Sequence, residues 1–321
     1  MRRIAVMTSG GDSPGMNAAI RAVVRFGIER GLEVYGIERG FQGLLDGDMH
    51  KMDRRSVGDI LQRGGTILKT ARCKEYQTIE GTARAHQILE TFGIEALVNI
   101  GGEGSMQGTL RLSRNHNYPV ICIPGTIDND LAYTEMTIGF DTAVNTVLDA
   151  ITRVRDTSSA HDRTTLIEVM GRHCGDIALY SGLAGGAEFV LVPEREENLK
   201  DLCQKIIEGK NSGKQHSIII RAEGYPVSSQ DVVEYVRNRT GQEVRLVVLS
   251  YLQRGGSPSL RDRIFATECG LKAVELLCDG IYNKAIGLVG GEVVGFDLAE
   301  ALDVQPEFKA DMYEAIKILA K

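Results

Sequence analysis

The sequence predicts an α/β fold in which mostly parallel sheets carry helices on both faces. Short runs rich in β-branched residues alternate with longer amphipathic segments along almost the whole chain, and this alternation is typical of βαβ units. Many of the 37 glycines fall beside apolar runs, where turns approach ligands. The length of 321 residues is sufficient for two domains with ordinary cores.

The expected strands are short apolar runs with many branched side chains. They are residues 4–7, 34–37, 96–100, 120–123, 165–169, 189–192, 217–221, 244–249 and 285–289. Several segments between them have apolar side chains at helical spacing and are expected to be helices. These helices include residues 17–30, 139–157, 199–208, 230–239 and 262–277. In parallel sheets ligands bind beyond the carboxyl ends of the strands, so we expect functional residues directly after the strands.

Composition and charge exclude several classes of protein. The net charge of −6 argues against nonspecific nucleic-acid binding. No apolar run approaches the roughly 18 residues that a membrane span requires, and the first strand begins too early to leave room for a signal peptide. The six cysteines form no CxxC pair, as expected of reduced thiols. We therefore expect a soluble cytoplasmic protein that binds neither nucleic acid nor membrane.

The first segment that could carry chemistry is TSGGDSPGMN at residues 8–17, which follows the first strand and opens a helix. Glycine lets backbone N–H groups approach a phosphate, and a helix N-terminus favours negative charge. Taken alone, the segment is also compatible with a Rossmann turn, for which Glu38 has about the spacing of the ribose-binding acid. A tight turn of purely structural role is a third interpretation.

A second glycine segment, Gly101–Ser105 followed by Gly108, lies at another strand end. Two phosphate-type loops on different strands indicate a phosphoryl donor that faces an acceptor, since a dinucleotide needs only one such loop. The Glu103 carboxylate is placed to hold a magnesium ion shared with the phosphates. The alternative for Glu103 is an exposed first-turn acid favoured by the helix dipole.

The third segment, PGTIDND at residues 124–130, has two carboxylates and a hydroxyl after the strand 120–123. A hydroxyl that attacks a phosphoryl group needs a base within hydrogen-bond reach; an Asx-rich turn is the alternative. We expect arginines to follow the strands of the second half, at Arg163, at Arg172 beside Gly171, and at Arg245. A guanidinium binds phosphate bidentately, so localised arginines in an acidic protein favour small anionic ligands.

Other chemistries lack their motifs. The histidines (residues 50, 86, 116, 161, 173 and 216) have no metal-ligand spacing, so zinc catalysis is not expected. No Walker GxxxxGKS/T sequence occurs, which disfavours P-loop proteins.

The chain closely resembles the bacterial ATP-dependent 6-phosphofructokinase family in a series of strings that follow one another along nearly its whole length. They are TSGGDSPGMNAAIR, RGGT, GGEGS, PGTIDND, TIGFDTA, RDTSSAHDR, VMGRHCGD, AGGAEF and QRGGSPS. The resemblance implies transfer of the γ-phosphoryl group of ATP to the 1-hydroxyl of fructose 6-phosphate, with Mg²⁺ as cofactor. This reaction is the committed step of glycolysis.

The resemblance also implies roles for individual residues. Asp128 would accept the proton of the sugar hydroxyl, and Thr126, Arg172 and the backbone at Gly11 would stabilise the phosphoryl group in transfer. The nucleotide and its magnesium would contact Gly11, Arg72, Cys73, Gly102, Glu103, Gly104, Ser105 and Gly108. The sugar phosphate would contact Thr126, Ile127, Asp128, Arg163, Met170, Gly171, Arg172, Glu223, Arg245, Tyr251 and Arg254. Of these, Arg163 and Arg245 would come from a neighbouring subunit.

Two glycines bear on the choice of donor. Family members that use pyrophosphate tend to have Asp in place of Gly104 and Lys in place of Gly125, and these side chains would intrude on the α-phosphate of a nucleotide. Glycine at both positions therefore favours ATP. One alternative is a weakly catalytic regulatory paralogue that binds nucleotide and sugar phosphate. A pyrophosphate-dependent phosphofructokinase is the less favoured alternative.

The family has a regulatory site between subunits, which binds ADP as activator and phosphoenolpyruvate as inhibitor. The matching residues are Arg21, Arg25, Arg54, Arg55, Asp59, Arg155, Gly186, Glu188, Lys214 and His216. Arg21 and Arg25 are four residues apart and share a helix face, so they could bind one phosphate together.

The architecture implied by the resemblance is a homotetramer of chains with two doubly wound three-layer domains. Residues 1–138 plus 251–302 would form the nucleotide-binding domain. Residues 139–250 plus 303–321 would form the sugar-phosphate domain, with the active site in the cleft between the two.

The chain departs from the family pattern in three respects. The family's GGDGS is GGEGS here, and the longer Glu103 predicts reduced turnover or a magnesium ion held through water. Tyr251 stands where the family usually has histidine, and the loss of positive charge predicts weaker sugar affinity. Ser212 and Gln215 replace lysines at the regulatory site, which predicts weak inhibition by phosphoenolpyruvate.

Overall fold

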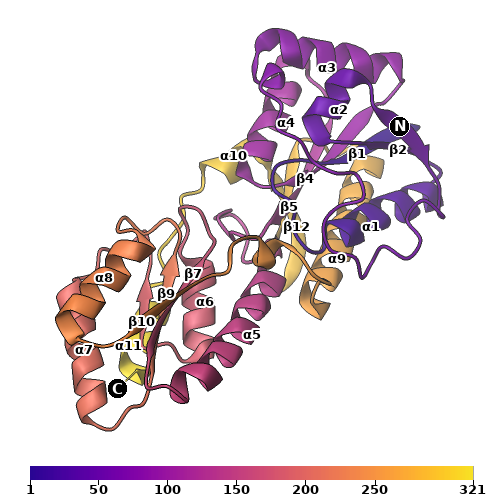
Figure 1. Ribbon diagram of the computed structural model, residues 1–321. Coiled ribbons are helices and arrows are strands. Elements are labelled where there is room, and N and C mark those ends of the chain that lie inside the picture. Colours follow the sequence, from indigo (N-terminus) through magenta and orange to yellow (C-terminus); the bar gives the residue numbers. More distant parts are fainter. Residues whose placement is uncertain (321) are drawn as a thin grey trace. The chain divides into compact units, whose positions relative to one another are not determined.

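The computed structural model describes residues 1–320 and divides into two compact units (Figure 1). The first comprises Met1–Ile127, Leu131–Thr142 and Arg254–Pro306; the second comprises Asp128–Asp130, Ala143–Gln253 and the chain from Glu307 onward. Each unit contains a mostly parallel sheet flanked by helices, so the predicted α/β fold class is confirmed. The assignment of nucleotide and sugar-phosphate binding to separate domains remains a prediction.

The sheet of the first unit follows the order β12-β11-β5-β4-β1-β2-β3, and β6 pairs with β5. Its strands are β1 (Arg3–Thr8), β2 (Glu33–Ile37), β3 (Met49–Met52), β4 (Ala96–Gly101), β5 (Val120–Thr126), β6 (Ile138–Gly139), β11 (Lys284–Val289) and β12 (Glu292–Asp297). Neighbouring strands are parallel except in the β2–β3 and β11–β12 pairs at the edges. The central strands β1, β4 and β5 are almost wholly buried, as expected for apolar runs covered on both faces.

Helices cover both faces of this sheet (Figure 1). On one face, α1 (Met16–Glu29) and α9 (Leu260–Cys278) pack against each other. Their close approach requires glycine at Gly270, where an added Cβ would lie 2.6 Å from the Cβ of Ala22. The other face carries α2 (Gly40–Asp46), the 3-10 helix η1 (Glu75–Gln77), α3 (Ile79–Thr91), α4 (Glu103–His116) and α10 (Leu298–Asp303).

The sheet of the second unit follows the order β10-β7-β9-β8 and is parallel throughout. Its strands are β7 (Thr164–Val169), β8 (Phe189–Leu191), β9 (Ser217–Ala222) and β10 (Val244–Val248). The helices are α5 (Phe140–Ser159), α6 (Asp176–Gly185), α7 (Leu199–Asn211), α8 (Ser229–Thr240) and α11 (Ala310–Leu319), and η2 (Ser250–Arg254) follows β10. α7 packs against α8, and α6 packs against α11 on the other side of the sheet (Figure 1). No helix within residues 1–320 has both the length and the apolar character needed to cross a bilayer.

All the predicted strands are present, with small differences at their ends. One difference affects the site, because β5 continues through Thr126 and does not end at residue 123. Thr126 is therefore held in the sheet and does not lie in a free turn. The strands β3, β6 and β12 were not predicted: β6 has two residues, while β3 and β12 are antiparallel edge strands with partly exposed side chains.

The prediction that Arg163 and Arg245 follow strands is wrong. Arg163 immediately precedes β7, and Arg245 is the second residue of β10 and stands in register with Thr165. Both arginines therefore lie at the amino ends of parallel strands. The apolar residues that form these strands lie on the C-terminal side of the two arginines, so the strands begin at the arginines and do not end there.

Candidate functional site

The central strands of the first unit bring two predicted loops and Thr126 to one edge of the sheet. β1, β4 and β5 are neighbours and end at Thr8, Gly101 and Thr126. The loops after them are in contact: a Cβ at Gly10 would lie 3.0 Å from Ser105 Oγ, and a Cβ at Gly102 would lie 3.4 Å from the Cβ of Thr126. The sequence segments 8–17, 101–108 and 124–126 therefore meet at a single site.

Arg254 lies across the first glycine segment. Its Nη1 donates to the backbone oxygen of Asp12 at 3.1 Å. A Cβ at Gly11 would lie only 2.5 Å from the same Nη1, so any larger residue would displace the guanidinium. The structure thus joins two predicted site residues, Gly11 and Arg254, that are far apart in sequence.

The second glycine segment is shaped by close packing at Gly101 and by a buried polar network. A Cβ at Gly101 would lie 2.6 Å from both Ser9 O and Ser105 Oγ. Asn99, in the middle of β4, accepts from Ser9 Oγ at 3.0 Å and donates to Thr109 Oγ1 at 2.7 Å. Because buried polar groups in low dielectric hold one geometry, this network fixes the loop before any ligand binds.

Glu103 is the first residue of α4 and is exposed. Its Oε1 accepts a hydrogen bond from Gln107 Nε2 at 2.7 Å, one helical turn later. Within residues 1–320, no group of three or more His, Cys, Asp and Glu side chains converges as a metal site. A cation here would therefore need oxygen ligands from a bound phosphate in addition to Glu103.

The two donor-related glycines have different surroundings. A Cβ at Gly104 would meet no atom within 4 Å, so a side chain there would project into open space beside the loop. A Cβ at Gly125 would lie 3.0 Å from the side chains of both Ile100 and Met16. The expected intrusion on a nucleotide thus fits Gly104, whereas a side chain at 125 would crowd Ile100 and Met16 inside the protein.

The strand β6 beside Thr126 is anchored by a buried carboxylate that the sequence did not reveal. Asp262 is wholly buried and accepts hydrogen bonds from Gly139 N and Thr142 N, both at 2.8 Å, and from Thr142 Oγ1. Gly139 belongs to β6 and stands in register with Thr126. Burial raises the pKa of Asp262, while the donors of Thr142 and Gly139 act in the opposite direction.

In the second unit, predicted sugar-site residues meet at the carboxyl ends of β7 and β9. Arg172 N donates to Glu223 Oε1 at 2.9 Å, and Met170 N donates to the buried Gln253 at 3.2 Å. Gly171 has a φ of 129°, and a Cβ there would lie 2.3 Å from Cys174 O. Only glycine therefore permits this turn, which presents Arg172.

Arg163 and Arg245, which are also predicted to bind the sugar phosphate, lie at the opposite, amino ends of the strands of the same sheet. Arg163 Nε donates to Glu243 Oε2 at 2.8 Å, and Arg245 forms an ion pair with the other oxygen of that carboxylate. Arg172 follows β7, whereas Arg163 precedes it, and six residues of strand span about 20 Å. One chain therefore does not bring Arg163 and Arg245 together with Met170, Gly171 and Arg172.

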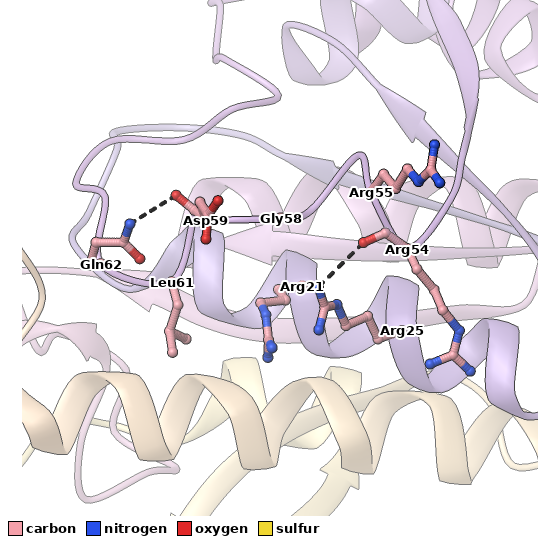
Figure 2. Close-up of a pocket in the computed structure, with 8 residues that line it drawn as sticks. All are labelled: Arg21, Arg25, Arg54, Arg55, Gly58, Asp59, Leu61 and Gln62. Atoms are coloured by element: carbon pink, nitrogen blue, oxygen red, sulfur yellow. Dashed lines mark hydrogen bonds between the residues drawn. The ribbon is translucent and has the colours of Figure 1, made fainter.

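Predicted regulatory residues form a pocket of about 600 Å³ in the first unit (Figure 2). Arg21 and Arg25 project from α1 beneath the loop that carries Arg54 and Asp59 (Figure 2). Arg25 Nη2 donates to the backbone oxygen of Arg54 at 3.4 Å. The pocket is lined by Arg21, Arg25, Arg54, Arg55, Gly58, Asp59, Leu61 and Gln62. Four arginines around one hollow favour an anion such as a phosphate.

The remaining predicted regulatory residues gather in the second unit, near the amino ends of β8 and β9. Arg155 Nη2 donates to the backbone oxygen of Gly186 at 3.1 Å. Lys214 Nζ lies 2.8 Å from Glu188 Oε1, and His216 Nδ1 is 2.9 Å from Ser159 Oγ. Each unit thus holds its own part of the predicted regulatory set.

Arg72 and Cys73 lie in the segment between β3 and η1. Arg72 is exposed, and Cys73 is partly buried against the core of the first unit. Lys69 lies earlier in this segment, and its backbone oxygen accepts a hydrogen bond from Thr8 Oγ1 at 2.9 Å. The segment is therefore tied to the end of β1, from which the first glycine loop departs.

Residues 3–277 match the family model described as Phosphofructokinase. The chain belongs to the phosphofructokinase family. It is 53% identical over 321 residues to an ATP-dependent 6-phosphofructokinase of Clostridium botulinum (strain Loch Maree / Type A3), with both chains covered completely. It is 55% identical over 320 residues to the ATP-dependent 6-phosphofructokinase of Clostridium tetani (strain Massachusetts / E88), again with complete coverage of both.

Solved phosphofructokinases have the same fold. The structure of phosphofructokinase from Saccharomyces cerevisiae superposes with a TM-score of 0.90 at 32% identity and covers 100% of this chain and 48% of that one. A pyrophosphate-dependent phosphofructokinase from Marinobacter aquaeolei superposes with a TM-score of 0.87 at 19% identity, covering 100% and 92%. Membership of the phosphofructokinase family also excludes the Rossmann interpretation, and Glu38 instead pairs with Lys69 at 2.8 Å.

Several polar residues that form hydrogen bonds or ion pairs next to the predicted site residues were not identified from the sequence. They are Asn99, Gln253, Asp262 and the ion pair of Asp176 with Lys309. A signal was available for Asn99, because a polar residue in the middle of an otherwise apolar strand must find a buried partner. For Asp262 and Lys309 the partners lie 120 or more residues away along the chain, and no local pattern identifies them.

Proposed function

We propose that this chain phosphorylates the 1-hydroxyl of fructose 6-phosphate with ATP, giving fructose 1,6-bisphosphate and ADP, the committed step of glycolysis in the cytoplasm. The observation that carries the proposal is the meeting of two glycine loops and Thr126 at one sheet edge, in a chain over 50% identical to curated ATP-dependent 6-phosphofructokinases. Such loops suit phosphate because their backbone N–H groups can approach it closely.

On the nucleotide side, Gly11 and the loop of Gly102, Gly104 and Ser105 would hold the phosphates of ATP. The open space at Gly104 leaves room beside this loop, and the N-terminus of α4 favours negative charge. Gly108 is packed beneath Phe41 and Tyr76 and supports the first turns of α4. Arg72 and Cys73 would extend the contacts along the nucleotide.

On the acceptor side, Asp128 would take the proton of the 1-hydroxyl as the sugar oxygen attacks the γ-phosphorus. The bond from that phosphorus to the β,γ-bridging oxygen breaks, and ADP leaves with its electron pair. Thr126 and Arg172 would stabilise the negative charge on the transferring group. Asp128 stands two residues after Thr126, which is held in β5, so the base and the phosphoryl site are joined by a short stretch of chain.

Magnesium would be held by Glu103 together with oxygens of the nucleotide phosphates. A carboxylate oxygen at a helix N-terminus beside a phosphate loop suits this hard cation, which usually takes only one or two protein carboxylates. When bound, it neutralises charge on the β- and γ-phosphates. Gln107 restrains the Glu103 carboxylate and offsets part of the freedom that its extra methylene adds.

The change Glu103→Asp is expected to alter turnover by about threefold to tenfold and to shift the magnesium dependence, because magnesium demands near-ideal octahedral geometry. Turnover should be measured across a magnesium titration, with Mn²⁺ binding to the nucleotide complex followed by electron paramagnetic resonance as a readout independent of activity. Gln107→Leu is the matched control that frees the carboxylate without shortening it. Unchanged turnover and unchanged metal affinity in Glu103→Asp would remove this role.

The assembly we propose is a homotetramer in which Arg163 and Arg245 act on the sugar phosphate of a neighbouring subunit. Their place at the amino edge of the β7–β10 pair, about 20 Å from Arg172, supports contributions from different chains. β10 and η2 also expose apolar side chains toward and beyond the carboxyl end of β10, including Val248 at 50% and Tyr251 at 77%. Exposed apolar side chains grouped in this way suit burial against another subunit.

ADP is the proposed activator, bound at a site between subunits to which different chains contribute the arginine pocket of α1 and the Arg54 loop, and the set Arg155, Gly186, Glu188, Lys214 and His216. Phosphoenolpyruvate is the proposed weak inhibitor at the same place. Both effectors carry a phosphate group, and the four arginines that line the pocket can bind phosphate through charged hydrogen bonds.

One coupled assay tests the proposed function. Purified protein is given fructose 6-phosphate with either ATP or pyrophosphate, and the rates are repeated across ADP and phosphoenolpyruvate, with the mass measured by sedimentation. We expect ATP-dependent product, activation by ADP and the mass of a tetramer. Product formed with pyrophosphate but not with ATP would show that pyrophosphate, and not ATP, is the phosphoryl donor. No product from either donor would favour a binding paralogue in place of an enzyme.

A further inference from the structure

Asn129 has an unusual backbone conformation at the centre of the PGTIDND segment. It lies between Asp128 and Asp130, and its φ is 53°, in the left-handed region. Asparagine tolerates this region better than most residues, but it still requires local support. Asp128 is the residue before Asn129, so the backbone conformation at Asn129 affects the position of the Asp128 carboxylate.

A buried ion pair supplies that support from within the second unit. Asn129 Nδ2 donates to Asp176 Oδ2 at 2.7 Å, and Lys309 Nζ lies 2.5 Å from the same oxygen. Asp176, the first residue of α6, is 5% exposed. Burial alone lowers the pKa of Lys309, but the Asp176 carboxylate outweighs it and the net shift is upward, so Lys309 stays charged at neutral pH.

We propose that Asp176 and Lys309 are positioning residues that hold the Asn129 turn and thereby fix the Asp128 carboxylate. Asp176 is the last residue of the VMGRHCGD string, and the proposed mechanism gives Asp176 no role. Lys309 lies outside residues 3–277 of the family match. The effect on turnover rests on the proposed function, in which Asp128 is the base. The effect on the turn itself does not depend on it.

A purely structural role is the competing explanation, because an acid in the first turn also stabilises its helix and Lys309 fastens the C-terminal segment to α6. The chain contains a matched control for this alternative. Lys317, also in the C-terminal segment, lies 2.8 Å from Glu197, whose side chain is 9% exposed. The side chain of Asp176 is 7% exposed. The Lys317 pair therefore resembles the Lys309 pair but does not contact the Asn129 turn.

The experiment compares Lys309→Met, Lys309→Arg and Lys317→Met with the unmodified chain. In Lys309→Met we expect kcat to fall about tenfold with both KM values within about twofold, since small displacements of a reacting group are costly. Lys309→Arg should retain most of the turnover because it keeps the charge. Lys317→Met should keep kcat within about twofold, whatever it does to the melting temperature. Amide hydrogen exchange of residues 126–132 should become faster in Lys309→Met and not in Lys317→Met.

Unchanged kcat and unchanged exchange in Lys309→Met would overturn the proposal, as would an equal fall of kcat in Lys317→Met. Should Lys309→Met fail to fold, Asp176→Asn gives the same test with an isosteric change. If the unmodified chain transfers no phosphoryl group, the proposed function fails. The exchange of residues 126–132 then decides the positioning role by itself.

Discussion

Replacement of Asp128 by asparagine is expected to lower kcat by a factor of about 10²–10⁴, the usual contribution of a positioned general base. The amide has nearly the shape of the carboxylate but does not accept a proton at neutral pH. The fold and the binding of both substrates should therefore survive, with KM values within about threefold, because the lost interaction develops only in the transition state. Steady-state kinetics with ATP and fructose 6-phosphate measures both quantities.

The control for this prediction is Asp130→Asn, which makes the same change of charge two residues later. Asp130 is also partly shielded from solvent, so a general loss of negative charge in the segment would affect both variants equally. We expect Asp130→Asn to retain at least about a tenth of the turnover, since it removes no proton acceptor from the reacting hydroxyl. A larger loss in Asp130→Asn than in Asp128→Asn would assign the base to Asp130.

Much of the fold could be predicted because its central strands are distinctive in sequence. β1, β4, β5, β7 and β9 are covered on both faces and appear as short apolar runs, as parallel strands do. The edge strand β3 reads MHKM and exposes half of its side chains, so it lacks the alternating or continuous apolar pattern that marks a strand. β12 reads EVVGFD and has no fully buried residue; Gly295 interrupts its apolar run, which weakens the strand pattern.

The site was predictable only where a local pattern carries the chemistry. Glycine segments at strand ends can be recognised locally, and the structure brings them together because β1, β4 and β5 are neighbours. The side of the sheet on which Arg163 and Arg245 lie depends on where β7 and β10 begin. The strands predicted at residues 165–169 and 244–249 begin within one residue of β7 and β10, so the predicted strand bounds already place both arginines at the amino ends.

Asp262→Ala is expected to destabilise the first unit by about 3 kcal/mol or more, because each buried donor left without an acceptor costs about 1–3 kcal/mol. The change removes the acceptor of Gly139 N, Thr142 N and Thr142 Oγ1 in a wholly buried place. Asp262→Asn should cost less, since its amide oxygen can still accept. The free energy of unfolding should be measured in urea at equal protein concentrations, because assembly contributes to apparent stability.

Asp297 offers the matched control for a carboxylate that accepts only local hydrogen bonds. It is partly exposed and accepts from Ala299 N at 2.9 Å and Glu300 N at 3.2 Å at the start of α10. Its replacement by alanine should cost about 0.5–2 kcal/mol, the range for a helix cap. If Asp262→Ala costs no more than Asp297→Ala, the carboxylate is not the anchor of β6. If it costs more and kcat also falls while the KM values hold, Asp262 fixes β6 and, through the register of Gly139 with Thr126, the phosphoryl site.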